Sequence, residues 1–303
     1  MNSYWSRRPS RPVYIAAAIL CAVAMLPLAA NAQGRAESRA IQSKVLGRPV
    51  RYTVLLPPSF DAEKSRRYAV LYYLHGLGDN EQTLVNLGGW DLVEHLIETH
   101  EIGEFLIVTP SAGRSFYINS RDGRERYEDF LLQELIPAVE QRYRGLGTRA
   151  GRAVSGTSMG GYGALRLAFR YPNLFIAASA HMAALAEDLP QTLKEVFGKG
   201  LAAFGDPFDD RFWKENSPFT AARRSGSLAS LKIYFDCGRQ DDYGFDAGAQ
   251  ALHELLTKRG VAHEFHLYPG RHNGEYVAAH FPDALRFHSR AFGTQGKTKS
   301  PQF

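Results

Sequence analysis

Apolar and polar positions along the chain follow two patterns. Short, mostly apolar runs between turn residues are typical of strands in a sheet covered on both faces. Longer stretches have apolar residues at helical spacing. Strands are predicted at Val50–Leu56, Tyr68–Leu74, Phe105–Thr109, Arg152–Val154, Leu174–Ala180, Leu231–Phe235 and His263–Tyr268. Helices are predicted at Trp90–Glu101, Arg124–Arg144, Met159–Tyr171, Phe245–Arg259 and Glu275–Arg290.

This alternation of strands and helices predicts an α/β fold. Hydrophobic strands separated by helices form a mostly parallel central sheet with helices on both faces. We expect one such domain over residues 49–292. A polar leader is predicted over residues 33–48, and a polar, disordered tail over residues 293–303.

The alternation of predicted strands and helices is interrupted between Met182 and Arg224. This segment places aromatic residues among prolines and glycines. One interpretation is an insertion that covers the carboxyl edge of the sheet near the active site. The other is irregular surface structure, and the sequence favours neither.

The N-terminus has the parts of a secretory signal peptide. Basic residues within 7–11 precede the apolar stretch Val13–Ala30, and Ala30-Asn31-Ala32 is a small-x-small cleavage site. We expect cleavage between Ala32 and Gln33, and a secreted or periplasmic protein without a membrane span. The alternative is an uncleaved anchor, because the apolar stretch reaches the minimum span of roughly 18 residues. The cleavage site and the polar segment after it favour removal.

Composition and charge limit the function only slightly. The 303 residues are 45% apolar and 22% charged, an ordinary globular composition. The formal charge is +5, but the signal peptide holds three arginines and no acid, so 33 basic and 31 acidic residues remain. The remaining charges are scattered, and we expect no nucleic-acid partner.

The cysteines and histidines give no sign of a metal or a cofactor. Of the two cysteines, Cys21 is lost with the signal peptide, which leaves Cys237 alone. A disulfide framework and a cysteine-rich metal site are therefore excluded. His75, His95 and His100 show no ligand pattern with nearby carboxylates. We expect neither a metal nor a cofactor.

Residues 156–160, Gly-Thr-Ser-Met-Gly, match the G-x-S-x-G pattern of a nucleophile elbow. A predicted strand precedes the motif and an amphipathic helix follows it, which is the setting that this motif requires. Side chains at the glycine positions of so sharp a turn would collide with backbone. The turn puts the oxygen of Ser158 at the amino end of a helix, whose dipole favours negative charge. Ser158 is therefore the predicted nucleophile, and the alternative is a glycine-rich turn without chemistry.

A serine nucleophile needs a base to take its proton and an acid to orient that base. In folds that carry this nucleophile elbow, the order along the chain is Ser, then Asp or Glu, then His. His272 lies in the turn-rich segment 269–274, directly after the last predicted strand. Such loops at the carboxyl ends of parallel strands carry catalytic groups. His272 is the predicted base, whereas His280 and His288 fall within the last predicted helix.

The orienting acid should follow the strand Leu231–Phe235. Asp236 ends that strand, and Asp246 begins the next helix, where an acidic cap is expected. Asp241 and Asp242 occupy the middle of the loop, and their chemistry does not separate them. One of the two could orient the imidazole while the other caps the helix.

An oxyanion hole needs two backbone N–H donors. One is expected at Met159, directly after the nucleophile. The other is expected in the glycine-rich turn His75–Gly78, with Leu77 as the donor. The alternative for this segment is a plain tight turn.

Seven segments carry a family resemblance: Tyr73–Gly78, Tyr127–Phe130, Glu134–Pro137, Ser155–Gly161, Asn216–Pro218, Cys237–Asp241 and Gly270–His272. They resemble the esterase D group of α/β hydrolases, which includes S-formylglutathione hydrolases, bacterial feruloyl and acetyl xylan esterases, and the antigen 85 mycolyltransferases. The resemblance extends over roughly residues 51–292. It implies the α/β-hydrolase fold and favours Asp241 as the acid, because the family's acid lies in a C-G-x-x-D stretch. It also supports Leu77 and Met159 as oxyanion donors.

Departures from the family narrow the expected function. The antigen 85 proteins use a glutamate as the acid, and none lies between Asp236 and Asp246. S-formylglutathione hydrolases are cytosolic, which disagrees with the signal peptide. The resemblance therefore implies a secreted serine carboxylic-ester hydrolase that forms an acyl-enzyme. Its partners would be acylated carbohydrates or small acyl esters.

Three alternative functions are an acyltransferase of the mycolyltransferase type, a thioesterase like the S-formylglutathione hydrolases, and a carbohydrate-binding protein that lost catalysis. The intact Ser, His and Asp set argues against the last. Candidate substrate-contacting residues are His75, Phe116, Tyr117 and Trp213. For Phe116 and Tyr117 a packing role weighs equally, and the oligomeric state stays open.

Overall fold

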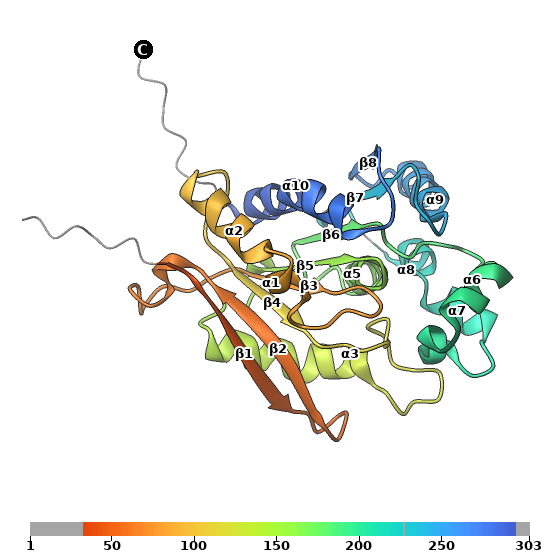
Figure 1. Cartoon of the computed structure of the whole chain (residues 1–303), viewed down its shortest axis with the longest axis horizontal. Coiled ribbons are helices and arrows are strands. Elements are labelled where there is room, and N and C mark those ends of the chain that lie inside the picture. The colour runs from red at the N-terminus through yellow and green to blue at the C-terminus, as the bar shows by residue number, and fades with distance from the viewer. Residues whose placement is uncertain (1–32, 227, 295–303) are drawn as a thin grey trace, which may run out of the picture. The chain divides into compact units, whose positions relative to one another are not determined.

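One eight-stranded sheet forms the centre of the computed structural model, which describes residues 33–226 and 228–294 (Figure 1). Its strands lie in the order β1-β2-β4-β3-β5-β6-β7-β8. They are β1 (Arg35–Gln42), β2 (Pro49–Leu56), β3 (Val70–Leu74), β4 (Leu106–Pro110), β5 (Arg152–Thr157), β6 (Ala177–His181), β7 (Lys232–Gly238) and β8 (Glu264–Tyr268). All neighbours from β4 to β8 pair in parallel, whereas β1–β2 and β2–β4 are antiparallel. The predicted signal peptide and the end of the predicted tail lie outside the described residues.

Helices cover both faces of the sheet because its central strands are apolar on both sides. In β3, Val70, Tyr72 and Leu74 pack into one hydrophobic core, and Leu71 and Tyr73 into the other. The first core is closed by α3, α4, α5, α8 and α9, and the second by α1, α2 and α10. The prediction of an α/β fold with a mostly parallel sheet is therefore confirmed.

The helices are bounded as follows: α1 (Thr83–Asn86), α2 (Gly89–Glu98), α3 (Tyr127–Phe130), α4 (Ile136–Arg142), α5 (Met159–Arg170), α6 (Gln191–Phe197), α7 (Asp210–Asn216), α8 (Pro218–Arg224), α9 (Phe245–Lys258) and α10 (Gly274–Phe292). In the described part of the chain, none of them has the length and hydrophobicity that a membrane span requires. The helix predicted over Arg124–Arg144 is irregular, since a π-helical turn at Leu131–Leu135 joins α3 to α4. Pro137 supplies the reason, because it has no N–H and its ring collides with the carbonyl four residues earlier in a regular helix.

The two ends of the domain carry more structure than the sequence pattern predicts. Within the predicted polar leader, residues 35–42 form β1, which pairs with β2 along the sheet edge. Both faces of β1 are largely exposed, so no alternation of apolar residues reveals it. At the other end, Gly293 belongs to the predicted tail but caps α10 with a φ of 69°. Thr294 donates its N–H to the carbonyl of Ser289 at 3.1 Å.

The segment from Met182 to Arg224 is mainly helical. It contains α6, a 3₁₀ helix over Gly198–Phe204, α7 and α8. The rings of Phe204 and Trp213 pack 4.7 Å apart in the core, while α8 packs against α5. The segment is therefore an ordered cover of the helix that follows Ser158.

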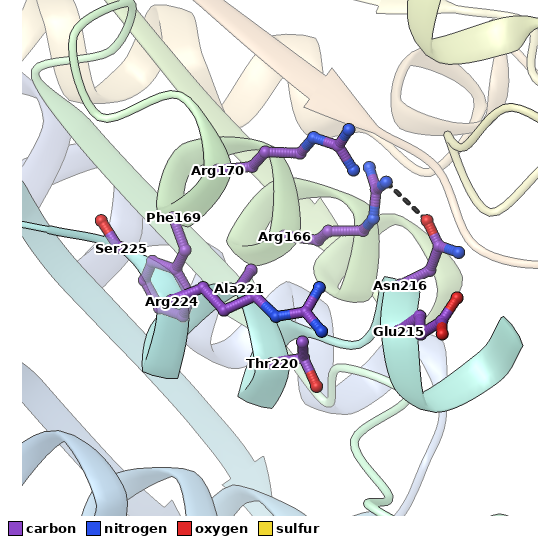
Figure 2. Close-up of a pocket in the computed structure, with 9 residues that line it drawn as sticks. All are labelled: Arg166, Phe169, Arg170, Glu215, Asn216, Thr220, Ala221, Arg224 and Ser225. Atoms are coloured by element: carbon purple, nitrogen blue, oxygen red, sulfur yellow. Dashed lines mark hydrogen bonds between the residues drawn. The ribbon is translucent and has the colours of Figure 1, made fainter. Parts of the chain in front are cut away.

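A buried ion pair ties α5 to α3. Nη1 of Arg166 lies 2.6 Å from Oε2 of Glu128, and its Nη2 lies 2.7 Å from Oδ1 of Asn216. The hydroxyl of Tyr171 donates to the second oxygen of Glu128. Figure 2 shows Arg166 turned toward Asn216 at the edge of a cavity of about 230 Å³. Two of the segments that carry the family resemblance, those around Glu128 and Asn216, thus hold α5 in place.

Replacement of Arg166 by Met should lower the free energy of unfolding by about 3–5 kcal/mol, because the Glu128 carboxylate stays buried without its partner. Arg170 also faces Glu128, at 3.4 Å, but its side chain is 51% exposed. Arg170→Met is therefore the matched control, with an expected loss of about 0–1 kcal/mol. Urea unfolding followed by circular dichroism measures both. If both variants lose the same free energy of unfolding, the buried pair of Arg166 and Glu128 does not stabilise the fold more than the exposed contact of Arg170.

Candidate active site

The parallel strands bring three loops to one edge of the sheet. Ser158 directly follows β5, Asp241 lies in the loop after β7, and His272 lies in the loop after β8. Because β5 to β8 run in parallel, their carboxyl ends meet at the same edge. The residues that the sequence predicts as nucleophile, acid and base are therefore neighbours in space.

The turn that carries Ser158 is strained and depends on two glycines. Ser158 has φ 55° and ψ −116°, a conformation that residues with a side chain rarely adopt. A Cβ atom at Gly156 would lie 2.3 Å from the carbonyl oxygen of Gly160. One at Gly160 would lie 1.8 Å from the carbonyl oxygen of Leu74 in β3. Neither position has room for a side chain.

Ser158, His272 and Asp241 form one hydrogen-bonded chain. Nε2 of His272 lies 2.9 Å from Oγ of Ser158, and Nδ1 lies 2.7 Å from Oδ2 of Asp241. An ionised carboxylate only accepts hydrogen bonds, so Nδ1 carries the proton and Nε2 accepts from the hydroxyl. The side chain of Asp241 is fully buried and that of His272 is 10% exposed. In this arrangement an imidazole can take the proton of a serine hydroxyl.

The loop after β7 surrounds the Asp241 carboxylate with donors. Its Oδ1 accepts the N–H groups of Tyr243 at 2.9 Å and Phe245 at 3.3 Å, and the Cys237 thiol lies 3.5 Å from Oδ2. Burial raises the pKa of Asp241, but the hydrogen bond and the electrostatic attraction from His272, together with the two amides, outweigh it. The net pKa lies below the ordinary value, and Asp241 is ionised at neutral pH.

Asp242 is directed away from the imidazole. Its side chain is 31% exposed and pairs with Arg271, and it accepts the backbone N–H of His272 at 3.1 Å. The hydrogen bond from Arg271 holds the pKa of Asp242 below its ordinary value. The two adjacent acids, which the sequence alone leaves open, therefore have different contacts. Asp241 touches the ring of His272, and Asp242 fixes its backbone.

The turn after β3 packs against Ser158. A Cβ atom at Gly76 would lie 3.6 Å from the Cβ of Ser158, and the Gly76 N–H donates to Oδ2 of Asp79 at 3.2 Å. Behind the turn, Nδ1 of His75 donates to the Gly76 carbonyl at 2.7 Å, and its Nε2 accepts the Ala112 N–H at 2.9 Å. Burial lowers the pKa of His75, which keeps the ring neutral. The buried ring of His75 thus fixes the shape of this turn.

Two backbone amides near Ser158 are available to a ligand. Met159 is the first residue of α5, and Leu77 lies in the turn after β3, on the wall of the same cleft as Ser158. Neither N–H donates to a protein acceptor within residues 33–226 and 228–294. The pair therefore fits the requirement for two free donors beside a reacting carbonyl.

Ser158 and His272 open into a cleft of about 730 Å³. Most of its wall is apolar and comes from the turn after β3, the α1–α2 segment, α6 and α10, through Leu77, Leu84, Leu87, Leu92, Val196, Phe197, Val277, Ala278 and Phe281. Leu87 and Val196 are each 66% exposed, and exposed apolar side chains that join a cleft indicate a ligand surface. Of the described residues, no Lys or Arg lines this cleft. None of their His, Cys, Asp and Glu side chains form a group that could hold a metal ion.

Three of the four predicted substrate-contacting residues lie in the core and not on the cleft. Phe116, Tyr117 and Trp213 are at most 3% exposed. Phe116 packs against Trp213 with a centroid distance of 6.2 Å, and the Tyr117 hydroxyl donates to the His75 carbonyl at 3.0 Å. The structure therefore gives these three residues a packing role, which for Phe116 and Tyr117 is the alternative that the sequence left open. His75 does line the cleft, but its ring nitrogens are bonded to backbone.

The sequence pattern does not single out the residues that line the cleft. Phe281 belongs to the apolar stripe of α10 and looks like a core residue. Phe197 lies in the segment whose path the pattern leaves open. The available signal is Leu87, a large apolar residue directly before the paired glycines Gly88 and Gly89, where a solvated turn is expected.

The sheet order, the strand–turn–helix at Ser158 and the three loops at one sheet edge define an α/β-hydrolase fold. The chain belongs to the family described as "Putative esterase", whose model matches residues 43–288. The predicted family resemblance is therefore confirmed.

Known relatives agree with this assignment. A ferulic acid esterase of known structure is 30% identical, with a TM-score of 0.76 over 87% of this chain and 100% of that chain. FphF of Staphylococcus aureus, a fluorophosphonate-binding serine hydrolase, shares the fold with a TM-score of 0.70 and 24% identity over 84% and 97% of the chains. Esterase Rv1288 of Mycobacterium tuberculosis is 29% identical over 76% of this chain and 54% of its own. The chain spans about half the length of the curated relatives it matches.

A Gly160→Ala substitution should destabilise the fold by about 3 kcal/mol or more, because the new methyl group meets backbone that cannot withdraw. Gly274→Ala is the control, since a Cβ atom there has no neighbour within 4 Å. Its expected effect is within about 0.5 kcal/mol. Thermal unfolding of the two variants measures the difference. A Gly160→Ala protein as stable as the control would contradict the close approach of α5 and β3.

Proposed function

We propose that this protein is a secreted serine carboxylic-ester hydrolase that works through an acyl-enzyme. The observation that carries the proposal is the hydrogen-bonded chain from Asp241 through His272 to Ser158, which opens into an apolar cleft. Membership of an esterase family supports ester hydrolysis as the reaction. The signal peptide predicted at the N-terminus, with cleavage expected between Ala32 and Gln33, supports secretion.

The first half of the reaction acylates Ser158. Its Oγ attacks the ester carbonyl while Nε2 of His272 takes the hydroxyl proton, and the Asp241 carboxylate stabilises the imidazolium that forms. The N–H groups of Leu77 and Met159 donate to the carbonyl oxygen as it becomes an oxyanion. The tetrahedral intermediate collapses when His272 returns the proton to the departing alcohol oxygen.

The second half releases the acyl group. A water molecule attacks the acyl-enzyme carbonyl and gives one proton to His272, and the same two amides hold the second oxyanion. Collapse of this intermediate returns the proton to Oγ of Ser158. The products are one carboxylic acid and one alcohol, and neither half needs a cofactor.

We propose acylated carbohydrates or small acyl esters as the substrate class. The ferulic acid esterase relative supports an ester of a small carboxylic acid. The resemblance to feruloyl and acetyl xylan esterases supports a carbohydrate as the alcohol. The apolar wall of the cleft supports an acyl group without charge, because an ion would lose hydration there without a partner.

The second candidate is a thioesterase of the S-formylglutathione hydrolase type. A Staphylococcus aureus enzyme with that name has a similar fold. Glutathione carries two carboxylates, and the cleft offers them no Lys or Arg among the described residues. The acidic Asp79 on the cleft wall disfavours them further. Acyl transfer to a sugar hydroxyl stays the third candidate, and a product assay with and without a sugar acceptor separates it from hydrolysis.

Substitution of Asp241 by Asn should lower kcat about 10⁴-fold, since an amide in place of the carboxylate favours the wrong imidazole tautomer. Asp242→Asn is the matched control in the same loop, with an expected loss below about tenfold. Initial rates on p-nitrophenyl butyrate measure both, and Ser158→Ala gives the background. If the two Asn variants lose kcat equally, the assignment of Asp241 as the orienting acid is wrong.

The esters methyl ferulate and p-nitrophenyl butyrate should exceed S-formylglutathione in kcat/KM by roughly 10²-fold or more, because the peptide carboxylates find no cation in the cleft. An uncharged thioester, S-acetyl-N-acetylcysteamine, controls for thioester chemistry and should be hydrolysed. A higher kcat/KM for S-formylglutathione than for the esters would replace the esterase proposal with the thioesterase.

A further inference from the structure

A second His–Asp pair is buried directly behind the nucleophile. His181 ends β6 and Asp236 lies in the neighbouring strand β7, with Nδ1 of the histidine 2.8 Å from Oδ2 of the aspartate. Both side chains are fully buried. The hydrolytic mechanism uses neither residue, yet burial of such polar groups costs free energy unless they are well bonded. The pair is hydrogen-bonded to the segments that hold Ser158 and His272.

One side of this pair holds the nucleophile. The backbone N–H of Ser158 donates to the carbonyl of His181 at 3.0 Å, and the Ser158 carbonyl accepts the Ala184 N–H at 3.1 Å. Met182, between them, donates its N–H to the Asp236 carbonyl at 2.9 Å and has a φ of 45°. The strained turn at Ser158 is thus bonded to a second strained turn, which the His181–Asp236 pair anchors from below.

The other side of the pair holds the loop of the base. The Tyr276 hydroxyl donates to Oδ1 of Asp236 at 3.0 Å, and the Tyr276 N–H donates to Oδ1 of Asn273 at 3.0 Å. The ring of Tyr276 also packs on Gly270, where a Cβ atom would lie 2.5 Å from the ring. His272 lies between Gly270 and Asn273, so one tyrosine fixes the chain on both sides of the base.

We propose that Asp236 is a positioning residue, which with His181 and Tyr276 sets the separation between Oγ of Ser158 and Nε2 of His272. One oxygen of its carboxylate is bonded to the β6 end that holds Ser158, and the other to the α10 start that holds His272. The inference rests on the proposed function, because it gives these residues a role only if Ser158 and His272 react together.

The chemistry of Tyr276 suits this role. Burial, and then the charge of Asp236, raises the pKa of the Tyr276 hydroxyl well above its ordinary value, so the hydroxyl keeps its proton and donates. Tyr234 lies near the same pair, with its ring 6.2 Å from that of His181. In the described part of the chain, the buried Tyr234 hydroxyl has no hydrogen-bond partner at ordinary distance, although burial, and then the charge of nearby Asp236, raises its pKa as well. Of the two hydroxyls, the one of Tyr276 lies within hydrogen-bond distance of Asp236, at 3.0 Å.

The test compares Tyr276→Phe with Tyr234→Phe, two variants that each lose one buried hydroxyl. A shift of about 1 Å between reacting groups can cost roughly 10²-fold in rate, so Tyr276→Phe should lower kcat at least about tenfold with KM nearly unchanged. Tyr234→Phe should keep kcat within about twofold of the wild type. Fluorophosphonate labelling of Ser158 should slow in Tyr276→Phe by the same factor as kcat, because it needs the same proton transfer.

The comparison also separates positioning from simple stability. Thermal unfolding is measured for both variants, and assays are run well below either midpoint. If Tyr276→Phe keeps wild-type kcat, or if both variants lose kcat in proportion to their loss of stability, the inference is wrong. Asp236→Asn, if it folds, should lower kcat at least as much as Tyr276→Phe. A wild-type protein without Ser158-dependent turnover would instead refute the proposed function itself, before any variant is compared.

Discussion

Ser158 has a strained backbone conformation, and the packing around it prevents the chain from relaxing. Helix α5 approaches β3 so closely that a methyl group at Gly160 would overlap the Leu74 carbonyl. The helix cannot retreat, since the ion pair between Arg166 and Glu128 fixes its far side. The conformation of Ser158 is therefore maintained by packing on both sides of α5, and strain at this residue is balanced by contacts made elsewhere.

The location of the candidate site could be predicted because it depends on local pattern and simple topology. A strand, a glycine-rich turn and a helix are visible around Ser158, and His272 follows the last apolar strand in a turn-rich loop. Parallel strands bring both loops to one edge of the sheet whatever the strand order is, so the order need not be known. Asp241 and Asp242 could not be separated in this way. They are adjacent and chemically identical, and only the path of the loop decides which carboxylate faces the imidazole.

Buried polar residues and core aromatics are the part that the pattern misreads. Phe116, Tyr117 and Trp213 surround other aromatic rings, but a sequence cannot tell an aromatic core from an aromatic cleft. His288 bonds to Ser179 at 2.8 Å inside the domain, and burial lowers its pKa to about 3. His288 looks like a surface position of a helix, because its partner Ser179 comes from a strand 109 positions away. The polar interior of this domain follows from tertiary contacts that no local window contains.

The outermost strand, β1, has a consequence for how the protein behaves in concentrated solution. Within residues 33–226 and 228–294, its outer edge has no strand partner and offers its backbone groups to any other extended chain, which is the usual starting point of aggregation. Arg35, Glu37 and Arg39 alternate along it and pair with one another on one face. A strand of another molecule that paired with β1 would remove water from these three charged side chains and would offer them no new partners. The charged face of β1 therefore disfavours such pairing.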